Sequence, residues 1–285
     1  MVYFRIQGNL GNVLFQHAAA LSLRRGRVVG VGDSAAAEKL RSYGRLFADT
    51  EVVPEPPAGV VTVRQEKCLP TGFPPDDGRD LYLEGYFQSE RYFDRDLVYE
   101  WARPSAERVD ALKMKYGDWL SRPGVVGISV RRGDYLRKGS WHPFVGERFF
   151  RDCLARLLEA RDFVVCSDGM EWCRRFFPKA FPGRRFLFVE GESVLDQLAV
   201  HVLCANNVIS NSSYSWWGAW LAKERRRRAG LSGTVLAPSM WYGYAAKRAG
   251  ATWSDLYFDG TEVVPNRYSP RTWFAAHWPW LAERD

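Results

Sequence analysis

The segment Val125-Val126-Gly127-Ile128-Ser129-Val130 runs directly into Arg131-Arg132-Gly133-Asp134-Tyr135. The apolar and β-branched residues of the first of these two peptides predict a buried strand. Paired arginines at the end of such a strand are unusual, because Arg is rarely buried without a partner. An arginine that faces a crevice there could grip a diphosphate through two hydrogen bonds, and Gly133 would let a ligand approach the backbone. The alternative is an ion pair between arginine and Asp134 that fixes the turn.

Similar short apolar runs recur along the chain, with helical stretches between them. The runs cover residues 2–6, 27–31, 60–63, 125–130, 163–166, 185–189, 207–209 and 234–236. Residues 147–160 place apolar side chains at helical spacing. Ser193 with Asp196 three residues on predicts the capped start of another helix. Strands that alternate with helices predict an α/β fold with parallel sheets.

The length of 285 residues predicts about two domains, at roughly 150 residues per domain. The stretch 121–124, Ser-Arg-Pro-Gly, stands directly before the 125–130 strand and is the best candidate for a linker. We therefore expect an N-terminal α/β domain over residues 1–122 with irregular loops rich in Pro and Gly. A C-terminal α/β domain would follow over residues 123–285.

The composition narrows the class of protein. With 46% apolar and 26% charged residues, it is typical of an ordinary globular protein. The formal net charge is +7 and 32 of the 40 cations are Arg, which hints at an anionic partner or reflects codon usage alone. Five cysteines form no CxxC pair, and no signal peptide or stretch of ~20 apolar residues is found. We expect a cytoplasmic protein, at most peripheral to the inner face of a membrane.

A second polar strand end occurs at Ser210-Asn211-Ser212-Ser213-Tyr214, which follows an apolar strand and leads into a helix rich in Trp. Serine hydroxyls together with the N–H groups of a helix start form an anion site at the carboxyl edge of a parallel sheet. The alternative is a serine that only caps the helix before a buried aromatic face.

Three further sets of residues are weaker signals. Residues 7–16 predict a strand, a glycine turn and a helix start, without the GxGxxG pattern. Asp168 lies at another strand end, and Asp196 could accept two N–H bonds from guanine; for both, helix capping stays open. The DxD spacing of Asp94 and Asp96 lies in a helix-like stretch and is interpreted as a chance match. The four histidines show no metal-binding spacing.

Three peptides, in this order, resemble the α-1,2-fucosyltransferase family and its α-1,6- and protein O-fucosyltransferase relatives. They are GNLGNVLFQHA from Gly8, SVRRGDYL from Ser129 and SNSSYSWWGAWL from Ser210. The resemblance implies a GT-B-type variant with two Rossmann-like domains, the C-terminal one binding GDP-fucose. It also implies inversion at the anomeric carbon and no metal or other cofactor. The implied reaction moves L-fucose from GDP-β-L-fucose to the 2-hydroxyl of a terminal β-galactoside, on an oligosaccharide or a glycolipid held on the N-terminal side.

The resemblance also implies roles for single residues. Arg131 would hold the donor β-phosphate with support from Arg132, and Asp196 would read guanine. The expected donor-binding residues are, in chain order, Gly11, Arg131, Arg132, Asp168, Asp196, Ser212, Ser213 and Tyr214. Two positions depart from the family: Ser129 stands where the arginine motif commonly begins with His, and Val13 replaces the usual Gln.

The expected catalytic residues are Asn12, Arg131 and Asp134. Asn12 matches an Asn near the reaction centre of related enzymes. The acceptor hydroxyl must lose a proton, and Asp134 is the first candidate for its base because it lies beside the arginines. His142, Glu147 or a mechanism without a dedicated base remain alternatives.

Two other functions stay open. Ser129 at a base-reading position leaves room for a transferase that uses another nucleotide-sugar. The net charge of +7, with many Arg and interleaved Trp, is also typical of a basic nucleic-acid-binding protein. The family resemblance implies no nucleic-acid partner.

Overall fold

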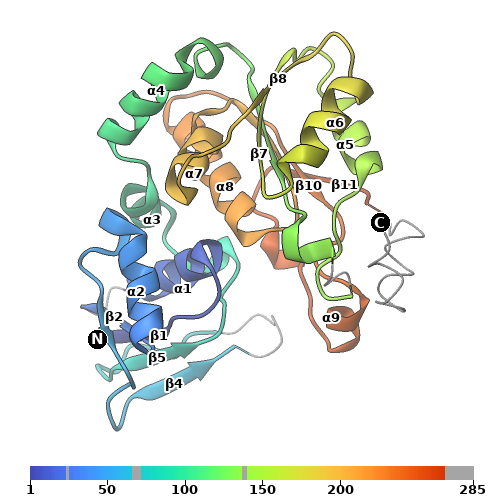
Figure 1. The fold of residues 1–285 in the computed structure, drawn as a ribbon. Coiled ribbons are helices and arrows are strands. Elements are labelled where there is room, and N and C mark those ends of the chain that lie inside the picture. Colours follow the sequence, from blue (N-terminus) through green and yellow to red (C-terminus); the bar gives the residue numbers. More distant parts are fainter. Residues whose placement is uncertain (24–25, 66–71, 137–139, 267–285) are drawn as a thin grey trace. The chain divides into compact units, whose positions relative to one another are not determined.

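The computed structural model describes residues 1–23, 26–65, 72–136 and 140–266. Cys68 and His277, which entered the cysteine and histidine patterns, lie outside the described residues. The chain divides into two compact units. The first unit is Met1–Arg103 with Gly250–Phe258, and the second is Pro104–Ala249 with the chain from Asp259 onward. Each unit is built on its own parallel sheet (Figure 1).

The first unit contains a five-stranded sheet in the order β3-β2-β1-β5-β4, with every neighbouring pair parallel. The strands are β1 Val2–Arg5, β2 Val28–Val31, β3 Glu51–Val53, β4 Val61–Arg64 and β5 Leu81–Glu84. The helices are α1 Leu10–Ser22, α2 Ser34–Ser42 and α3 Arg95–Ala102, with the 3-10 helices η1 Gly44–Phe47, η2 Glu90–Tyr92 and η4 Ser254–Leu256. The central strand β1 is buried at Val2 and Phe4, as expected of a parallel strand covered on both faces.

The second unit contains a six-stranded parallel sheet in the order β11-β10-β9-β6-β7-β8. The strands are β6 Val126–Val130, β7 Asp162–Ser167, β8 Arg185–Phe188, β9 Asn206–Ile209, β10 Val235–Pro238 and β11 Thr261–Val264. The helices are α4 Ala106–Leu120, α5 Glu147–Leu154, α6 Met170–Ala180, α7 Val194–Leu203, α8 Ser213–Arg228 and α9 Tyr244–Arg248, with the 3-10 helix η3 Gly133–Leu136. Among the described residues no helix has the length and apolar character needed to cross a membrane.

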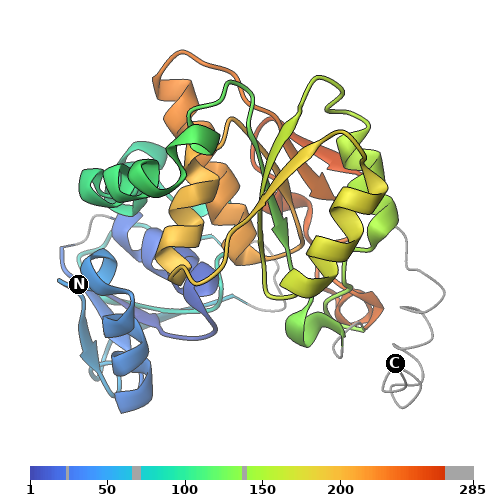
Figure 2. The same cartoon turned by 45° about the horizontal axis from the view of Figure 1, so that its top comes forward.

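Helices cover both faces of this second sheet. Val126, Ile128 and Val130 belong to the apolar cluster that includes α5 and α6. The opposite face packs against α4 and α7 through the cluster that contains Val125 and Val164. Figures 1 and 2 show α7 and α8 side by side on that opposite face. Side chains therefore alternate along β6 between two buried environments, as in any doubly covered sheet.

The strand order of the second unit reverses direction at β6 and β9. From β6 the chain builds outward through β7 to β8, and it then returns to add β9, β10 and β11 on the other side. Ligands of open α/β sheets bind outside the carboxyl ends of the strands at such a switch point. The topology therefore directs attention to the residues that follow Val130 and Ile209.

The predicted fold class, two α/β units that are each built on a parallel sheet, is confirmed. All eight predicted strands occur, with ends shifted by one or two residues. The strands β3, β5 and β11 were not predicted. Each is short and lies in the loop-rich first half or near the end of the described chain, where no long apolar run marks it.

The division between the units falls before α4, whereas the sequence places the linker at 121–124, after it. Leu112 and Leu120 of α4 pack in the same buried cluster as Val125 and Val200. This apolar contact attaches α4 to the second unit. The described units therefore differ from the predicted boundary at 122 by helix α4, and also by Gly250–Phe258, which belongs to the first unit.

The helix predicted over 147–160 is too long. It ends at Leu154, and the chain continues through turns in which Leu157 N–H donates to the Leu154 carbonyl. The guanidinium of Arg184 donates to the carbonyls of Leu154 (3.1 Å) and Leu157 (3.4 Å). It thereby satisfies groups that a helix end leaves unbonded. Leu158 is consequently two-thirds exposed (67%) instead of lying on a buried face.

Candidate active site

The carboxyl ends of β6 and β9 are joined through Ser210. Its hydroxyl donates to the Ser129 carbonyl (2.7 Å) and accepts from the Arg131 backbone N–H (2.9 Å). The Ser210 N–H also donates to the Ser129 carbonyl (3.1 Å). Ser210 is fully buried, so these bonds fix where Arg131 leaves the sheet. Ser212 and Ser213 were the predicted ligands at this strand end, and this role of Ser210 was not predicted.

The guanidinium of Arg131 contacts two carboxylates. Its Nη2 lies 2.6 Å from Oδ1 of Asp134, and its Nη1 lies 2.5 Å from Oδ2 of Asp168. The internal ion pair that stood as the alternative to a ligand grip is therefore present. The Arg131 side chain remains one-third exposed. Because charge-assisted bonds from both sides set its plane, the guanidinium is pre-oriented at the switch point.

Asp168 connects the two arginines. Its Oδ1 accepts the backbone N–H of Arg132 (2.7 Å), while Oδ2 pairs with Arg131. A Cβ atom on Gly133 would overlap Oδ2 of Asp168, so glycine at that position permits the close approach. Helix α6 has Gly169 as its N-cap, without a side-chain cap bond. Asp168 thus orders the arginine turn instead of capping the helix.

Arg132 is held differently from Arg131. Its guanidinium lies over the ring of Trp172, 4.4 Å from the ring centre, and near the ring of Phe144. Desolvation by burial lowers the pKa of Arg132, although an arginine still stays charged. Cation–π contacts of this kind stabilise a partly desolvated guanidinium. Arg132 therefore packs against aromatic rings while Arg131 presents its donors at the strand end.

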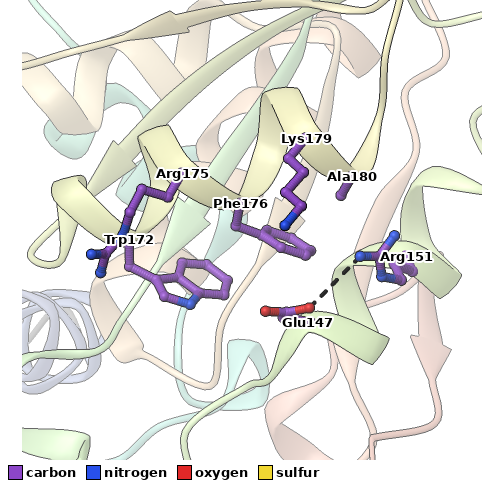
Figure 3. A pocket seen from close by; sticks show the side chains of 7 residues that line it. All are labelled: Glu147, Arg151, Trp172, Arg175, Phe176, Lys179 and Ala180. Atoms are coloured by element: carbon purple, nitrogen blue, oxygen red, sulfur yellow. Dashed lines mark ion pairs between the residues drawn. The ribbon is translucent and has the colours of Figure 1, made fainter. Parts of the chain in front are cut away.

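Trp172 also lines a hollow of about 290 Å³ between α5 and α6. Figure 3 shows the side chains that line it. They are Glu147, Arg151, Trp172, Arg175, Phe176, Lys179 and Ala180. Glu147, one alternative for the base, lies here 3.7 Å from Arg151. Trp172 stacks on Phe176, with 4.7 Å between ring centres, and it also contacts the guanidinium of Arg132. Trp172 therefore lies between the hollow and the arginine turn.

The start of α8 lies beside these groups. Ser212 is the N-cap in an extended conformation, and its hydroxyl makes no cap bond to the helix. The first N–H groups of any helix lack partners within it and carry a partial positive charge. Trp216, Trp217 and Trp220 are almost completely buried and anchor the helix from its other side. The predicted anion site at Ser212 and Ser213 thus has a rigid helix start behind it.

Tyr214 connects α8 to α7. Its hydroxyl donates to the Val194 carbonyl at the start of α7 (2.6 Å), and burial raises its pKa well above the ordinary value. Ser129, at the position where the family commonly has His, lies 2.6 Å through its hydroxyl oxygen from that of Ser215 on α8. It is buried, so its hydroxyl serves the contact between β6 and α8.

Asp196 sits at the start of α7 in the predicted capping arrangement. Its N–H donates to the Ser193 hydroxyl (3.1 Å), and that hydroxyl donates to Asp196 Oδ2 (2.5 Å). Arg108 of α4 donates to the other oxygen (2.6 Å). The capping alternative is thus present, and an arginine not considered from the sequence pairs with the same carboxylate. Its reading of guanine stays a prediction.

In the first unit, Gly11 and Asn12 lie in the first turn of α1. Asn12 Oδ1 accepts from Gln88 Nε2 (2.7 Å). Gly8 has φ +78°, and a Cβ there would overlap the Asn12 amide; glycine satisfies both demands. The chain before Gln88 is unusual, because buried Phe87 has φ +51°. Gln88 was not predicted, because no sequence pattern connects it to Asn12, which lies 76 positions away.

Several interpretations of isolated residues can be placed. Asp94 caps α3 by accepting the N–H groups of Asp96 and Leu97, as expected of a chance DxD match. His201 is buried on α7, and its Nδ1 lies 3.2 Å from Asn207 Oδ1. Within the described ranges, no three His, Cys, Asp or Glu side chains gather in a way that could hold a metal ion.

Residues 62–242, more than half of the chain, match the model of glycosyl transferase family 11. The chain belongs to this family. It is 29% identical over 167 residues to an alpha-1,2-colitosyltransferase of Escherichia coli, covering 55% of each chain. It is 33% identical over 105 residues to galactoside alpha-(1,2)-fucosyltransferase 1 of Sus scrofa, covering 34% of this chain and 28% of that one. The chain thus spans about half the length of the first relative and less of the second.

Solved structures of NodZ and POFUT1 are similar to this family 11 chain at low identity. The fucosyltransferase NodZ from Bradyrhizobium aligns with a TM-score of 0.48 and 14% identity, covering 78% of this chain and 93% of that one. POFUT1 in complex with GDP-fucose aligns with a TM-score of 0.45 and 12% identity, covering 82% and 96%.

In this family 11 chain the second unit brings together Arg131, Arg132, Asp134 and Asp168 at one turn. The same switch point contains the Ser212 cap of α8, joined to the turn through Ser210. Asp196 lies in the first turn of α7. Tyr214 of α8 contacts the start of that helix. Gly11 and Asn12 belong to the first unit and are described there alone.

Proposed function

We propose that this chain transfers L-fucose from GDP-β-L-fucose to the 2-hydroxyl of a terminal β-galactoside, with inversion and without a metal ion. The observation that supports it most is the pre-oriented Arg131 guanidinium at the β6/β9 switch point of a family 11 chain. Donors fixed where charge develops can lower a barrier by several kcal/mol. The location of the protein in the cytoplasm remains a prediction.

In the proposed reaction, the acceptor 2-oxygen forms a bond to C1 of fucose as the bond from C1 to the β-phosphate oxygen breaks. The electron pair of that bond leaves with GDP, so negative charge grows on the diphosphate. Arg131 and the N–H groups at the start of α8 are placed to stabilise this charge. The acceptor proton passes to the carboxylate of Asp134, which already lies beside Arg131.

A related donor is the second candidate. One relative is named a colitosyltransferase, and colitose is a deoxy sugar that differs from L-fucose by one hydroxyl. A hydrogen-bonding site can reject an analogue that lacks the bonded hydroxyl. A comparison of kcat/KM for GDP-fucose and GDP-colitose decides between the two donors.

The nucleic-acid alternative finds little support. Many arginines of the described chain pair with carboxylates, as in the pairs Arg156–Glu262, Arg103–Glu100 and Arg185–Asp162. Such pairing breaks up the continuous basic surface on which counterion release depends. We expect no binding to oligonucleotides at moderate salt in a fluorescence anisotropy titration.

The reaction is tested by incubating the purified chain with GDP-fucose and a panel of β-galactosides in excess EDTA. We expect GDP release that depends on the acceptor, and NMR of the product should show an α-fucosyl unit on the galactose 2-oxygen. Another linkage would refute the acceptor assignment. Strict dependence on a divalent metal would refute the proposed mechanism.

A further inference from the structure

Trp141 is exposed, whereas the other described tryptophans of the second unit are buried or half-buried. It exposes 51% of its surface, and it is the only tryptophan among the large exposed apolar side chains of the described residues. Trp216, Trp217, Trp220 and Trp241 are buried. A large apolar side chain left in water forgoes the stabilisation that its burial would give. Because an indole can stack on a ligand through its exposed face, Trp141 is a candidate for ligand contact.

The backbone around Trp141 is fixed on both sides. The Trp141 carbonyl accepts from Gly243 N–H (2.8 Å), and the Ser140 carbonyl accepts from Ala245 N–H (2.9 Å), which ties this stretch to α9. Two residues on, the Pro143 carbonyl accepts from the amide of buried Asn211 (2.9 Å). An exposed aromatic side chain on a fixed backbone loses little conformational freedom when it binds a partner.

The residue that follows Trp141 contacts the arginine turn. The ring of its neighbour His142 stacks on Tyr135, with 5.0 Å between ring centres. The guanidinium of Arg131 lies 5.3 Å from the centre of that same Tyr135 ring. The Tyr135 hydroxyl donates to the Asn211 carbonyl (3.1 Å), just before the start of α8. Two ring contacts therefore connect His142, the residue after Trp141, through Tyr135 to Arg131, which pairs with Asp134.

The two faces of the sheet separate Trp141 from Asp196. Val145, four residues after Trp141, packs in the cluster with α5 and α6 on one face. Asp196, the residue expected to read guanine, lies in the first turn of α7, which covers the opposite face. With the diphosphate at Arg131 in the centre, the base and Trp141 would lie on opposite sides. The transferred sugar and its acceptor then fall on the Trp141 side.

We propose that Trp141 is the stacking platform for the acceptor sugar, a β-galactopyranoside. This inference rests on the proposed function, and it places one acceptor contact in the second unit, whereas the family resemblance implied an acceptor held on the N-terminal side. The axial 4-hydroxyl of galactose leaves the C–H groups of carbons 3, 4 and 5 together on one apolar face of the ring. The face of an indole carries partial negative charge and attracts such C–H groups. Trp141 would thus hold the galactose ring while its 2-hydroxyl faces Asp134.

The test compares Trp141→Ala and Trp141→Phe with the wild-type chain, and uses Leu231→Ala as a control at another exposed apolar side chain (53% exposed). Steady-state kinetics give the KM for a β-galactoside and the KM for GDP-fucose separately. We expect Trp141→Ala to raise the acceptor KM about fivefold to tenfold. Its KM for GDP-fucose and its slow hydrolysis of the donor without acceptor should be unchanged. Trp141→Phe should recover most of the acceptor affinity, and Leu231→Ala should behave as wild type.

An unchanged acceptor KM in Trp141→Ala would overturn the inference while leaving the proposed function intact. A rise in the KM for GDP-fucose alone would also overturn it, because Trp141 would then contact the donor. A wild-type chain that releases no GDP from GDP-fucose would instead overturn the proposed function, and the role of Trp141 with it.

Discussion

Arg131 and Asp168, from the ends of neighbouring strands β6 and β7, form an ion pair with 2.5 Å between Nη1 and Oδ2. A guanidinium carries five N–H donors, so this pair and the one to Asp134 leave donors for a diphosphate. The two carboxylates fix the plane of the guanidinium before any ligand arrives. Little reorganisation is then required as negative charge develops on the leaving group.

Gly133→Ala should separate this pair. The added Cβ would overlap Oδ2 of Asp168, so the carboxylate must move away from Arg131. We expect GDP to bind about tenfold more weakly, as when one charge-assisted bond is lost. Gly146→Ala is the matched control, because a Cβ at Gly146 meets no atom within 4 Å. Equal GDP affinity in the two variants, measured by titration calorimetry, would show that the Asp168 contact does not matter for binding.

Asp134→Asn tests the base. An amide keeps the size of the carboxylate but takes up no proton, so we expect kcat to fall by about 10²–10⁴-fold. GDP affinity should change little, because the oxygen of the substituted amide can still accept a hydrogen bond from Arg131 and hold the plane of its guanidinium. Asp152→Asn, at an exposed position of α5, serves as the control. A kcat near that of wild type would point to one of the alternatives, His142, Glu147 or a mechanism without a base.

Asn12 and Gln88 should act as one unit. Gln88 donates to Asn12 Oδ1 and so fixes which way the Asn12 amide faces. If Asn12 takes part in the reaction, Gln88→Ala should lower kcat/KM, and Asn12→Ala should lower it further. The double variant should then be little worse than Asn12→Ala alone. A double-mutant cycle measures this, and strictly additive losses would mean that the two residues act independently.

Two buried histidines should make the fold sensitive to acid. Desolvation lowers the pKa of His17 to about 3 and that of His201 to about 4. Between those values and 6.5 the unfolded chain binds protons that the folded chain does not, so stability falls as the pH falls. Each histidine contributes up to about 1.4 kcal/mol per pH unit. Urea denaturation between pH 7 and pH 5 checks this. His201→Gln should show a shallower dependence, and an unchanged slope would contradict the assignment.

The sequence predicted best what depends on neighbouring residues. The run 125–130, the arginine turn and the Ser193–Asp196 capping arrangement all occur as expected. In each case the residues that specify the structure lie within one turn or one strand. The ends of the strands at the switch point follow from the same local pattern, because parallel strands present their carboxyl ends on one edge.

Contacts between distant residues account for the rest. The early end of α5 depends on Arg184, 30 positions beyond Leu154. The orientation of Asn12 depends on Gln88, and Asp196 pairs with Arg108, 88 positions before it. No periodicity or motif encodes such pairs. A single sequence therefore indicates which residues gather at a strand end more readily than what each side chain bonds to.

The central claim is that Arg131 grips the diphosphate of a guanine nucleotide. Titration calorimetry of GDP into the wild-type chain, Arg131→Ala and the exposed control Arg148→Ala tests it most directly. We predict that wild type and Arg148→Ala bind GDP alike and more tightly than UDP. Arg131→Ala should bind GDP at least about tenfold more weakly, since charge-assisted bonds worth ~1.5–3 kcal/mol are lost. Undiminished GDP affinity in Arg131→Ala, with its fold intact, would contradict the account.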